Sequence, residues 1–372
     1  MIFCSNCFKD AEIKTIIDKL GVMGDCPLCQ TNGIHIYDSS INNELDGIFD
    51  NLLSVYTPVE DLPEGYPNVE SKDLVDIMAN DWNIFSDRIT SDDIINILKS
   101  LSPDMVADFP SLFNSPVGIA EKYDLDYIKK ASILPNGSWD EFVESIKHKN
   151  RFHSNLINTD ILKEYCLHIE KNILAATKQH FYRGRIAPDS TGYKPKEMGA
   201  PPAEITTGGR ANAAGISRLY LSYKKNTTFH EIRAAEYDYV TVGTFKLKKD
   251  IKVVDLKQIG NISPFLPDMD CTALAINREH LQKINSEISK TMRRNDSPLD
   301  YIPTQYISDF IMSITNNNGS PLYDGIEYDS AMQNGGANLT IFDPSLFRCT
   351  YTQTYEVSKL TYRKKRFKKV RM

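Results

Sequence analysis

The chain has 372 residues, of which 41% are hydrophobic and 25% charged, a balance that is ordinary for a globular protein with a sizeable core. Its formal net charge of −6 argues against nonspecific nucleic-acid binding by the whole molecule. No apolar run reaches the roughly 18 residues that a membrane span needs, and the first residues lack a secretory signal pattern. We therefore expect a cytoplasmic protein with no membrane partner.

Four cysteines near the N-terminus have the spacing of a zinc site. Cys4 and Cys7 form one CxxC pair, and Cys26 and Cys29 form a second. Each CxxC turn directs two thiolates toward one point, and four thiolates complete a closed tetrahedral shell around Zn²⁺. We predict a structural zinc held by these four residues, with a helix between the pairs. His35 is the alternative ligand.

The stretch from about residue 40 to 178 is predicted to be mainly helical and contains no paired catalytic groups. Residues 57–70 hold three prolines and a glycine, which indicate a loop. Ser91 is expected to cap a helix whose apolar stripe runs to Leu101. A second helix is predicted at about 160–178, because apolar residues repeat there at helical spacing.

From Phe181 onward the hydrophobic period changes. Leu219 and Leu221 alternate with Tyr220, which predicts a strand with Tyr220 on the opposite face. A short helix through HEIRAAE would place Glu231 in its first turn, where a helix N-terminus stabilises an anion. We expect further strands at 239–247, at 251–256, around Tyr328 and at 339–342, and a helix at 303–315.

A set of polar side chains stands at the edges of these apolar runs, where residues tend to point from a rigid frame into a shared cleft. The set consists of Arg183, Arg210, Tyr220, Glu231, Ser330 and Asn338. Arginine suits a phosphate through its charged fork, and tyrosine can stack on a ring. The set therefore favours an anionic, sugar-bearing ligand. No GxGxxG or GxxxxGK[ST] motif occurs, which argues against a Rossmann or P-loop fold.

Several motifs of this region, in order, resemble the RES-domain family, named for an arginine, a glutamate and a serine. The motifs are FYRGRIAP, GAPP, GGRANAAGISRLYLSY, TFHEIRA, VVDL, YIPTQYISDFI, YDGIEYDSA and NLTIFD. The resemblance implies an ADP-ribosyltransferase-like fold with a split β-sheet, and an enzyme that cleaves the glycosidic bond of NAD, in some members with phosphate as acceptor. It also implies that Arg210, Tyr220, Glu231 and Ser330 are catalytic and that Arg183 and Asn338 contact the ligand.

The expected chemistry requires only one carboxylate. Cleavage between nicotinamide and ribose gives the anomeric carbon oxocarbenium character, which a carboxylate such as Glu231 can stabilise. Nicotinamide leaves as a neutral molecule from a cationic precursor, so no general acid is needed for its departure. Arg233 and Glu327 are polar neighbours to which we assign structural roles.

We expect an α+β fold in four parts. They are a Cys4 zinc knuckle at 1–37, a helical region at 38–180 that resembles the HEPN/RES-type N-terminal region, a catalytic domain at 181–347, and a basic tail at 348–372. The tail takes its charge from Arg363, Lys364, Lys365, Arg366, Lys368, Lys369 and Arg371. It is expected to be a solvated end or a contact for nucleic acid or an acidic partner.

The sequence thus predicts an NAD glycohydrolase or NAD phosphorylase that acts as a toxin or phage-defence effector. Its expected partners are NAD, inorganic phosphate, an antitoxin or another inhibitory or activating protein, and further copies of itself in a homo-oligomer. Two alternatives stay open. One is transfer of ADP-ribose to a macromolecule, and the other is a non-enzymatic protein that binds nucleic acid through its zinc knuckle and tail.

Overall fold

The computed structural model describes residues 1–67, 70–291 and 297–361. Its contacts divide the chain into two compact units. The first comprises Met1–Gly137, Leu156–Asn158 and Asn261–His280, and the second comprises Ser138–Asn155, Thr159–Gly260 and Leu281–Met372. Within the described ranges, the search for a helix of sufficient length and hydropathy to span a bilayer found none.

The first unit opens with a small antiparallel sheet and a helix. The sheet has the order β1-β3-β2, formed by β1 (Ile2–Cys4), β3 (Ile34–Asp38) and β2 (Met23–Gly24). Helix α1 (Ala11–Leu20) begins after Asp10, whose carboxylate accepts two backbone N–H groups, and ends at Gly21 in the left-handed conformation with φ 68°. The helix predicted between the two cysteine pairs is therefore confirmed.

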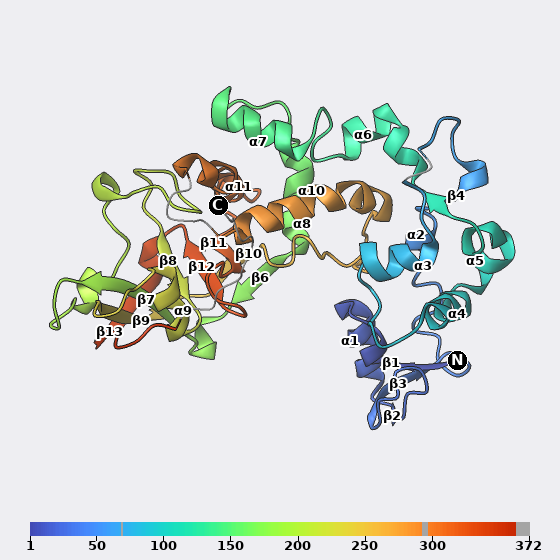
Figure 1. Ribbon diagram of the computed structural model, residues 1–372, viewed down its shortest axis with the longest axis horizontal. Coiled ribbons are helices and arrows are strands. Elements are labelled where there is room, and N and C mark those ends of the chain that lie inside the picture. Colours follow the sequence, from blue (N-terminus) through green and yellow to red (C-terminus); the bar gives the residue numbers. More distant parts are fainter. Residues whose placement is uncertain (68–69, 292–296, 362–372) are drawn as a thin grey trace, which may run out of the picture. The chain divides into compact units, whose positions relative to one another are not determined.

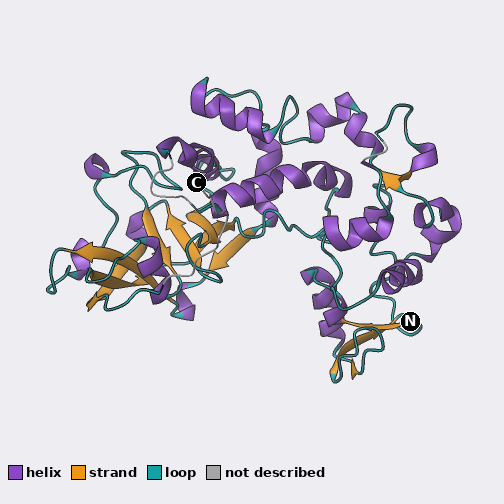
Figure 2. Ribbon diagram, in the orientation of Figure 1, coloured by secondary structure: helices purple, strands orange, loops and turns teal. Residues whose placement is uncertain are grey.

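Short helices make up most of the rest of the first unit (Figures 1 and 2). They are α2 (Asp50–Leu53), α3 (Leu74–Asp76), α4 (Ser91–Leu101), α5 (Pro103–Asp108) and α6 (Leu125–Ala131), beside a ribbon of β4 (Thr57–Pro58) and β5 (Val117–Gly118). The cap of α4 is Thr90, because Thr90 and Asp93 exchange side-chain and backbone hydrogen bonds in a capping box. The predicted cap, Ser91, is instead the first helical residue.

Within the described residues, the second unit holds one eight-stranded sheet (Figures 1 and 2). Its order is β13-β9-β7-β8-β12-β11-β10-β6, and in the part of the chain that the structure describes only β10 and β11 are parallel neighbours. The strands are β6 (Glu170–Ile173), β7 (His180–Ala187), β8 (Leu219–Ser222), β9 (Tyr239–Leu247), β10 (Ile251–Asp255), β11 (Gly325–Asp329), β12 (Ala337–Ile341) and β13 (Phe347–Glu356). The strands predicted from Leu219 to residue 342 are all present.

The two faces of this sheet bury different clusters. One face holds an apolar core that includes Phe181, Leu219 and Leu221. The other face carries Val240 and Val242 under α9 (Lys225–Glu231). The remaining helices of the unit are α7 (Trp139–His148), α8 (Thr159–His168), α11 (Ile302–Ser313) and the later residues of α10 (Cys271–Ser289).

The sheet is weakly joined between β7 and β8. Among the described residues their register is a single pair, Tyr182 with Ser222. In contrast, β7 pairs with β9 along the whole of His180–Ala187. The two strands therefore part beyond this one pair, and side chains on β7 and β8 can line an opening between them.

Two predicted boundaries require correction. Helix α8 ends at His168, and the residues after it form β6, which pairs with β10. The prediction extended the helix too far because apolar residues four apart fit both a longer helix and a helix end followed by a short strand. Residues 347–356 form β13, a Thr- and Tyr-rich strand that pairs along β9, so the predicted tail boundary at 348 falls inside the sheet. The basic residues from Arg363 onward lie outside the described residues.

Candidate active site

A cavity of about 260 Å³ lies where β7 and β8 part. Its lining residues come from four strands and one helix: Tyr182, Arg183, Gly184, Tyr220, Leu221, Ser222, Thr228, Glu231, Ile232, Tyr328 and Asn338. The structure thus brings together Arg183, Tyr220, Glu231 and Asn338 from the predicted polar set. Ser330 joins them through a hydrogen bond, whereas Arg210 does not line the cavity.

Helix α9 reaches the cavity because Gly184 leaves room for it on β7. A Cβ atom at Gly184 would lie 3.1 Å from the Cβ of Thr228 and 3.3 Å from the Cδ1 of Ile232. The helix ends at Glu231, so the predicted place of this residue in the first helical turn is wrong. Its carboxylate therefore lacks the stabilisation of a helix N-terminus, and side-chain donors supply it instead.

Two side chains fix the Glu231 carboxylate. Its Oε1 atom accepts a hydrogen bond from Ser330 Oγ at 2.5 Å and another from Asn338 Nδ2 at 2.8 Å. Asn338 is oriented in turn by Ser222, whose Oγ donates to Asn338 Oδ1 at 2.7 Å. The side chain of Glu231 is nevertheless exposed and lines the cavity. A fixed negative charge is therefore available to a ligand there.

The hydroxyl of Ser330 is itself oriented by the backbone. Ser330 Oγ accepts from the backbone N–H groups of Met332 at 3.2 Å and Gln333 at 3.1 Å. With its lone pairs engaged, the hydroxyl proton points to Glu231. Ser330 thus positions the carboxylate, and the turn that follows Ser330 fixes the orientation of its hydroxyl.

Arg183 brings a partly buried positive charge to the same cavity. Its Nε atom is buried and has no hydrogen-bond partner among the described residues, and its Nη1 makes one long bond of 3.4 Å to the Tyr220 carbonyl. Burial lowers the pKa of Arg183 to about 10, so the guanidinium stays charged at neutral pH. A desolvated cation without a carboxylate partner is costly, and an anionic ligand would offset that cost.

Tyr220 gives the cavity a fixed aromatic wall. Its hydroxyl donates to Asn212 Oδ1 at 2.6 Å and accepts from the backbone N–H of Ala211 at 3.0 Å. Burial raises the pKa of Tyr220 well above its usual range, so the phenol stays protonated. Tyr220 and Ser222 lie two residues apart on one strand, so the alternation that marked Tyr220 could also have identified Ser222.

The guanidinium of Arg210 does not line the cavity and instead contacts the end of α10. It donates to the carbonyl oxygens of Glu287 at 3.1 Å, Ile288 at 2.6 Å and Lys290 at 2.5 Å. These are carbonyls that a helix C-terminus leaves without intrahelical partners. In this arrangement Arg210 caps α10, so the expectation that it holds the ligand has no support in its contacts.

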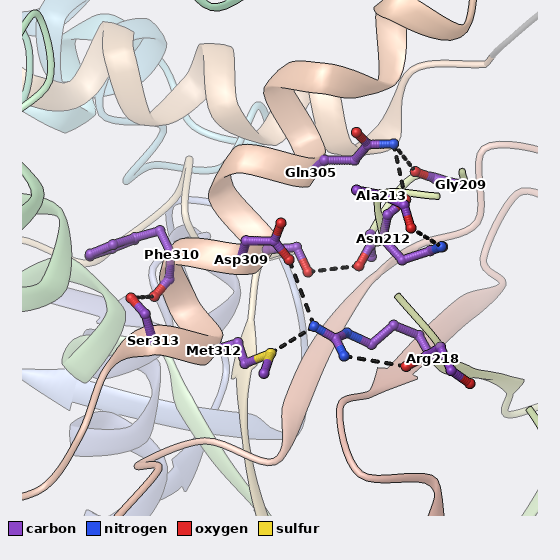
Figure 3. Close-up of polar contacts among 12 residues, drawn as sticks. Gly209, Asn212, Ala213, Arg218, Gln305, Asp309, Phe310, Met312 and Ser313 are labelled. Atoms are coloured by element: carbon purple, nitrogen blue, oxygen red, sulfur yellow. Dashed lines mark hydrogen bonds and ion pairs between the residues drawn. The ribbon is translucent and has the colours of Figure 1, made fainter. Parts of the chain in front are cut away.

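The loop that carries Arg210 is held by α11 (Figure 3). Gln305 Nε2 donates to the carbonyl oxygens of Gly209 at 2.8 Å and Asn212 at 3.0 Å. At the end of the loop, Arg218 lies 3.7 Å from Asp309 and bonds to Met312 Sδ at 2.6 Å. The loop is therefore fixed from α11, and it fixes Tyr220 through Asn212. No sequence pattern indicated a role for Asn212 or Gln305.

Replacing Arg210 by Ala is expected to lower the free energy of unfolding by roughly 1–3 kcal/mol, because the carbonyls at the end of α10 lose a charged donor. Urea denaturation of the wild type and the variant measures this change. Arg348→Ala, at an exposed position of β13, is the control and should change stability little. An Arg210→Ala variant as stable as the wild type would contradict the capping role.

The four N-terminal cysteines form a group that could hold a metal. Their Sγ atoms all lie within 4.8 Å of one another, with separations of 3.8 Å (Cys4–Cys7), 3.3 Å (Cys4–Cys29) and 3.5 Å (Cys7–Cys26). Thiolates at about 2.3 Å from a tetrahedral Zn²⁺ lie about 3.8 Å apart, so the group fits this ion. His35 instead bonds to Asp18 at 2.9 Å.

Comparison with known proteins finds a family match for the region that contains the cavity. The model of the RES domain family matches residues 182–360. A search of curated proteins and a search of solved structures each gave no match. The chain therefore contains a segment that matches the RES domain; it includes every residue of the cavity and extends past the predicted boundary at 347. A RES domain indicates an enzyme that acts on NAD. The match does not reach the N-terminal region, so the resemblance predicted there stays a prediction.

Proposed function

We propose that this protein cleaves the bond between nicotinamide and ribose in NAD, in the cavity between β7 and β8. The observation that carries the proposal is the pairing of opposite charges in one small cavity. Glu231 is exposed to it and fixed by Ser330 and Asn338, while Arg183 lines it as a partly buried cation without a carboxylate partner among the described residues. A cationic ribosyl centre and a phosphate are the two ligand groups that these charges complement.

In the proposed reaction the C–N bond to nicotinamide breaks and its electron pair stays on the ring nitrogen, so nicotinamide leaves neutral. Glu231 stabilises the positive charge that develops on the ribose. Tyr220 packs beside the nicotinamide ring, Arg183 binds the adjoining phosphate, and Asn338 and Ser330 keep the carboxylate in place. Water or inorganic phosphate then forms the new C–O bond, and a water nucleophile loses its proton to solvent. Arg210 supports the loop behind Tyr220.

Three features outside the chemistry belong to the same proposal. The parting of the sheet at β7 and β8 is what a split, ADP-ribosyltransferase-like sheet would show. Zn²⁺ held by the four cysteines would be structural, because four thiolates leave no open position for a substrate. The role as a toxin or defence effector, in the cytoplasm and under the control of an antitoxin or another protein, rests on the family.

The test is to incubate purified protein with NAD that carries the label in its adenylate half, with and without phosphate. Hydrolysis predicts labelled ADP-ribose in both conditions, whereas phosphorolysis predicts an additional phosphorylated product that needs phosphate. Label that remains on protein or nucleic acid would instead identify transfer to a macromolecule. If NAD stays intact in every condition, with phosphate and with candidate activating proteins, the proposal fails.

Replacing Arg183 by Met is expected to lower kcat/KM for NAD by roughly 10–150-fold, the loss of a charged hydrogen bond worth about 1.5–3 kcal/mol. The same change removes a partly buried charge that has no carboxylate partner in the described part of the chain, so the unliganded variant should be at least as stable as the wild type. Steady-state kinetics and thermal unfolding measure the two effects. Arg185→Met on the same strand is the control, because Arg185 does not line the cavity. A variant that loses stability together with activity would favour a structural role for Arg183.

A further inference from the structure

A second, larger cavity lies beside the first in the same unit, with a volume of about 760 Å³. Helix α9 lines both cavities, with Thr228 and Glu231 in the first, and Phe229 and His230 in the second. The turn after Ser330 is also shared. Its residue Gln333 lines the second cavity, while the backbone N–H of Gln333 donates to the serine hydroxyl that holds Glu231. The two cavities therefore lie against different faces of α9 and are linked by this helix and by the turn after Ser330, with no lining residue in common among those described.

The sizes of the two cavities match the two halves of a dinucleotide. Sites for small molecules and cofactors have volumes of roughly 300–1,000 Å³. The first cavity, at about 260 Å³, falls below this range, so it can take one end of a dinucleotide but not the whole molecule. The second, at about 760 Å³, has room for the remaining nucleotide.

The backbone at Arg233 gives an independent reason to assign a ligand to the second cavity. Helix α9 ends in a Schellman motif, in which Ala234 N–H donates to Phe229 O at 3.1 Å and Arg233 N–H donates to His230 O at 3.0 Å. Arg233 occupies the left-handed position of this motif with φ 52°, where glycine is the usual residue. An arginine at this position strains the backbone, and its side chain lines the cavity. Such strain is characteristic of residues kept for their function.

The lining of the second cavity suits a phosphate joined to a flat ring. Arg233 and Lys359 supply positive charge, and no described residue that lines it is an aspartate or a glutamate. Apolar surface comes from Phe229, Val357 and Leu360. Guanidinium and ammonium groups bind phosphate, and apolar and aromatic side chains pack against the face of a base.

We propose that the second cavity binds the adenylate half of NAD, with Arg233 on its phosphate. The inference rests on the proposed function, because it takes NAD as the substrate of the first cavity. It reassigns Arg233, for which the sequence favoured a structural role, to a residue that sets specificity for the dinucleotide over its nicotinamide mononucleotide half.

The test compares Arg233→Gly and Arg233→Lys with the wild type on two substrates, NAD and nicotinamide mononucleotide, which lacks the adenylate. In Arg233→Gly, the ratio of kcat/KM for NAD to kcat/KM for the mononucleotide should fall roughly 10–100-fold below the wild-type ratio. The ratio for Arg233→Lys should lie between those of the wild type and Arg233→Gly. Because glycine relieves the backbone, Arg233→Gly should unfold at the same temperature as the wild type or higher. A purely structural role would lower both kcat/KM values together and lower the unfolding temperature, and this result would overturn the proposal.

Binding of AMP, measured by calorimetry, separates this inference from the proposed function. The wild type should bind AMP, and Arg233→Gly should bind it at least 10-fold more weakly. If NAD is cleaved but AMP does not bind, or binds equally well to both proteins, the assignment of the second cavity is wrong. If AMP binds through Arg233 but NAD is never cleaved, the proposed function fails and the nucleotide site remains.

Discussion

Replacement of Glu231 by Gln is expected to lower the rate of NAD cleavage by roughly 10²–10³-fold, the usual loss when an enzyme gives up one preorganised electrostatic contact to its transition state. The amide oxygen of Gln can accept the hydrogen bonds that Ser330 and Asn338 now donate to Glu231 Oε1 at 2.5 Å and 2.8 Å. The side chain therefore keeps its place, and only its negative charge is lost. NAD should still bind, so the loss should fall on kcat more than on KM.

Single-turnover kinetics with saturating NAD measure this effect without interference from product release. Glu356→Gln is the matched control, because Glu356 is an exposed glutamate at the end of β13 and does not line the cavity. It should cleave NAD at the wild-type rate. A Glu231→Gln variant that retains more than about a third of the wild-type rate would show that this carboxylate does not stabilise the transition state.

Removal of zinc is expected to unfold the N-terminal sheet and α1. Structural zinc sites of this type have apparent binding free energies of about 10–16 kcal/mol, which exceeds the stability of a typical domain. Cys4 and Cys7 are fully buried, at 0% exposure each, so without the metal two thiols with their Sγ atoms 3.8 Å apart would remain in the core of this small sheet. Metal analysis should find one zinc per chain.

Circular dichroism and limited proteolysis, with and without a strong chelator, measure the loss of structure. Cleavage by the protease should begin between residues 1 and 38 once the metal is removed. Cys7→Ser should reproduce the effect of the chelator, whereas Cys349→Ser should not, since Cys349 lies on β13 outside the cysteine group. Protein that is purified without metal, yet resists proteolysis in this segment, would contradict a structural zinc.

Alternating and helical hydrophobic patterns predicted most elements of the RES domain, because burial on one face leaves a period in the sequence. The strand at Leu219–Ser222 and the helix at Ile302–Ser313 are examples. The end of α8 was not predictable in this way. Residues 170–173 become a strand only because β10 offers them a hydrogen-bonding edge, and β10 lies about eighty residues further along the chain.

The candidate site, like the fold, was predictable from the sequence only in part. The polar set was identifiable because its members flank apolar runs, and four of its six members line one cavity. The direction of each side chain was not identifiable. Arg210 turns to carbonyls at the end of α10, and Glu231 stands at the last residue of α9 instead of its first turn, because tertiary packing decides both.

The identity of the first product that wild-type protein releases from NAD distinguishes glycosidic cleavage from other reactions. Glycosidic cleavage predicts free nicotinamide, released at the rate at which NAD disappears and lost in Glu231→Gln but not in Glu356→Gln. Release of nicotinamide mononucleotide or AMP would mean that the diphosphate is cleaved and would contradict glycosidic cleavage. Nicotinamide release that is unchanged in Glu231→Gln would contradict the proposed role of this carboxylate.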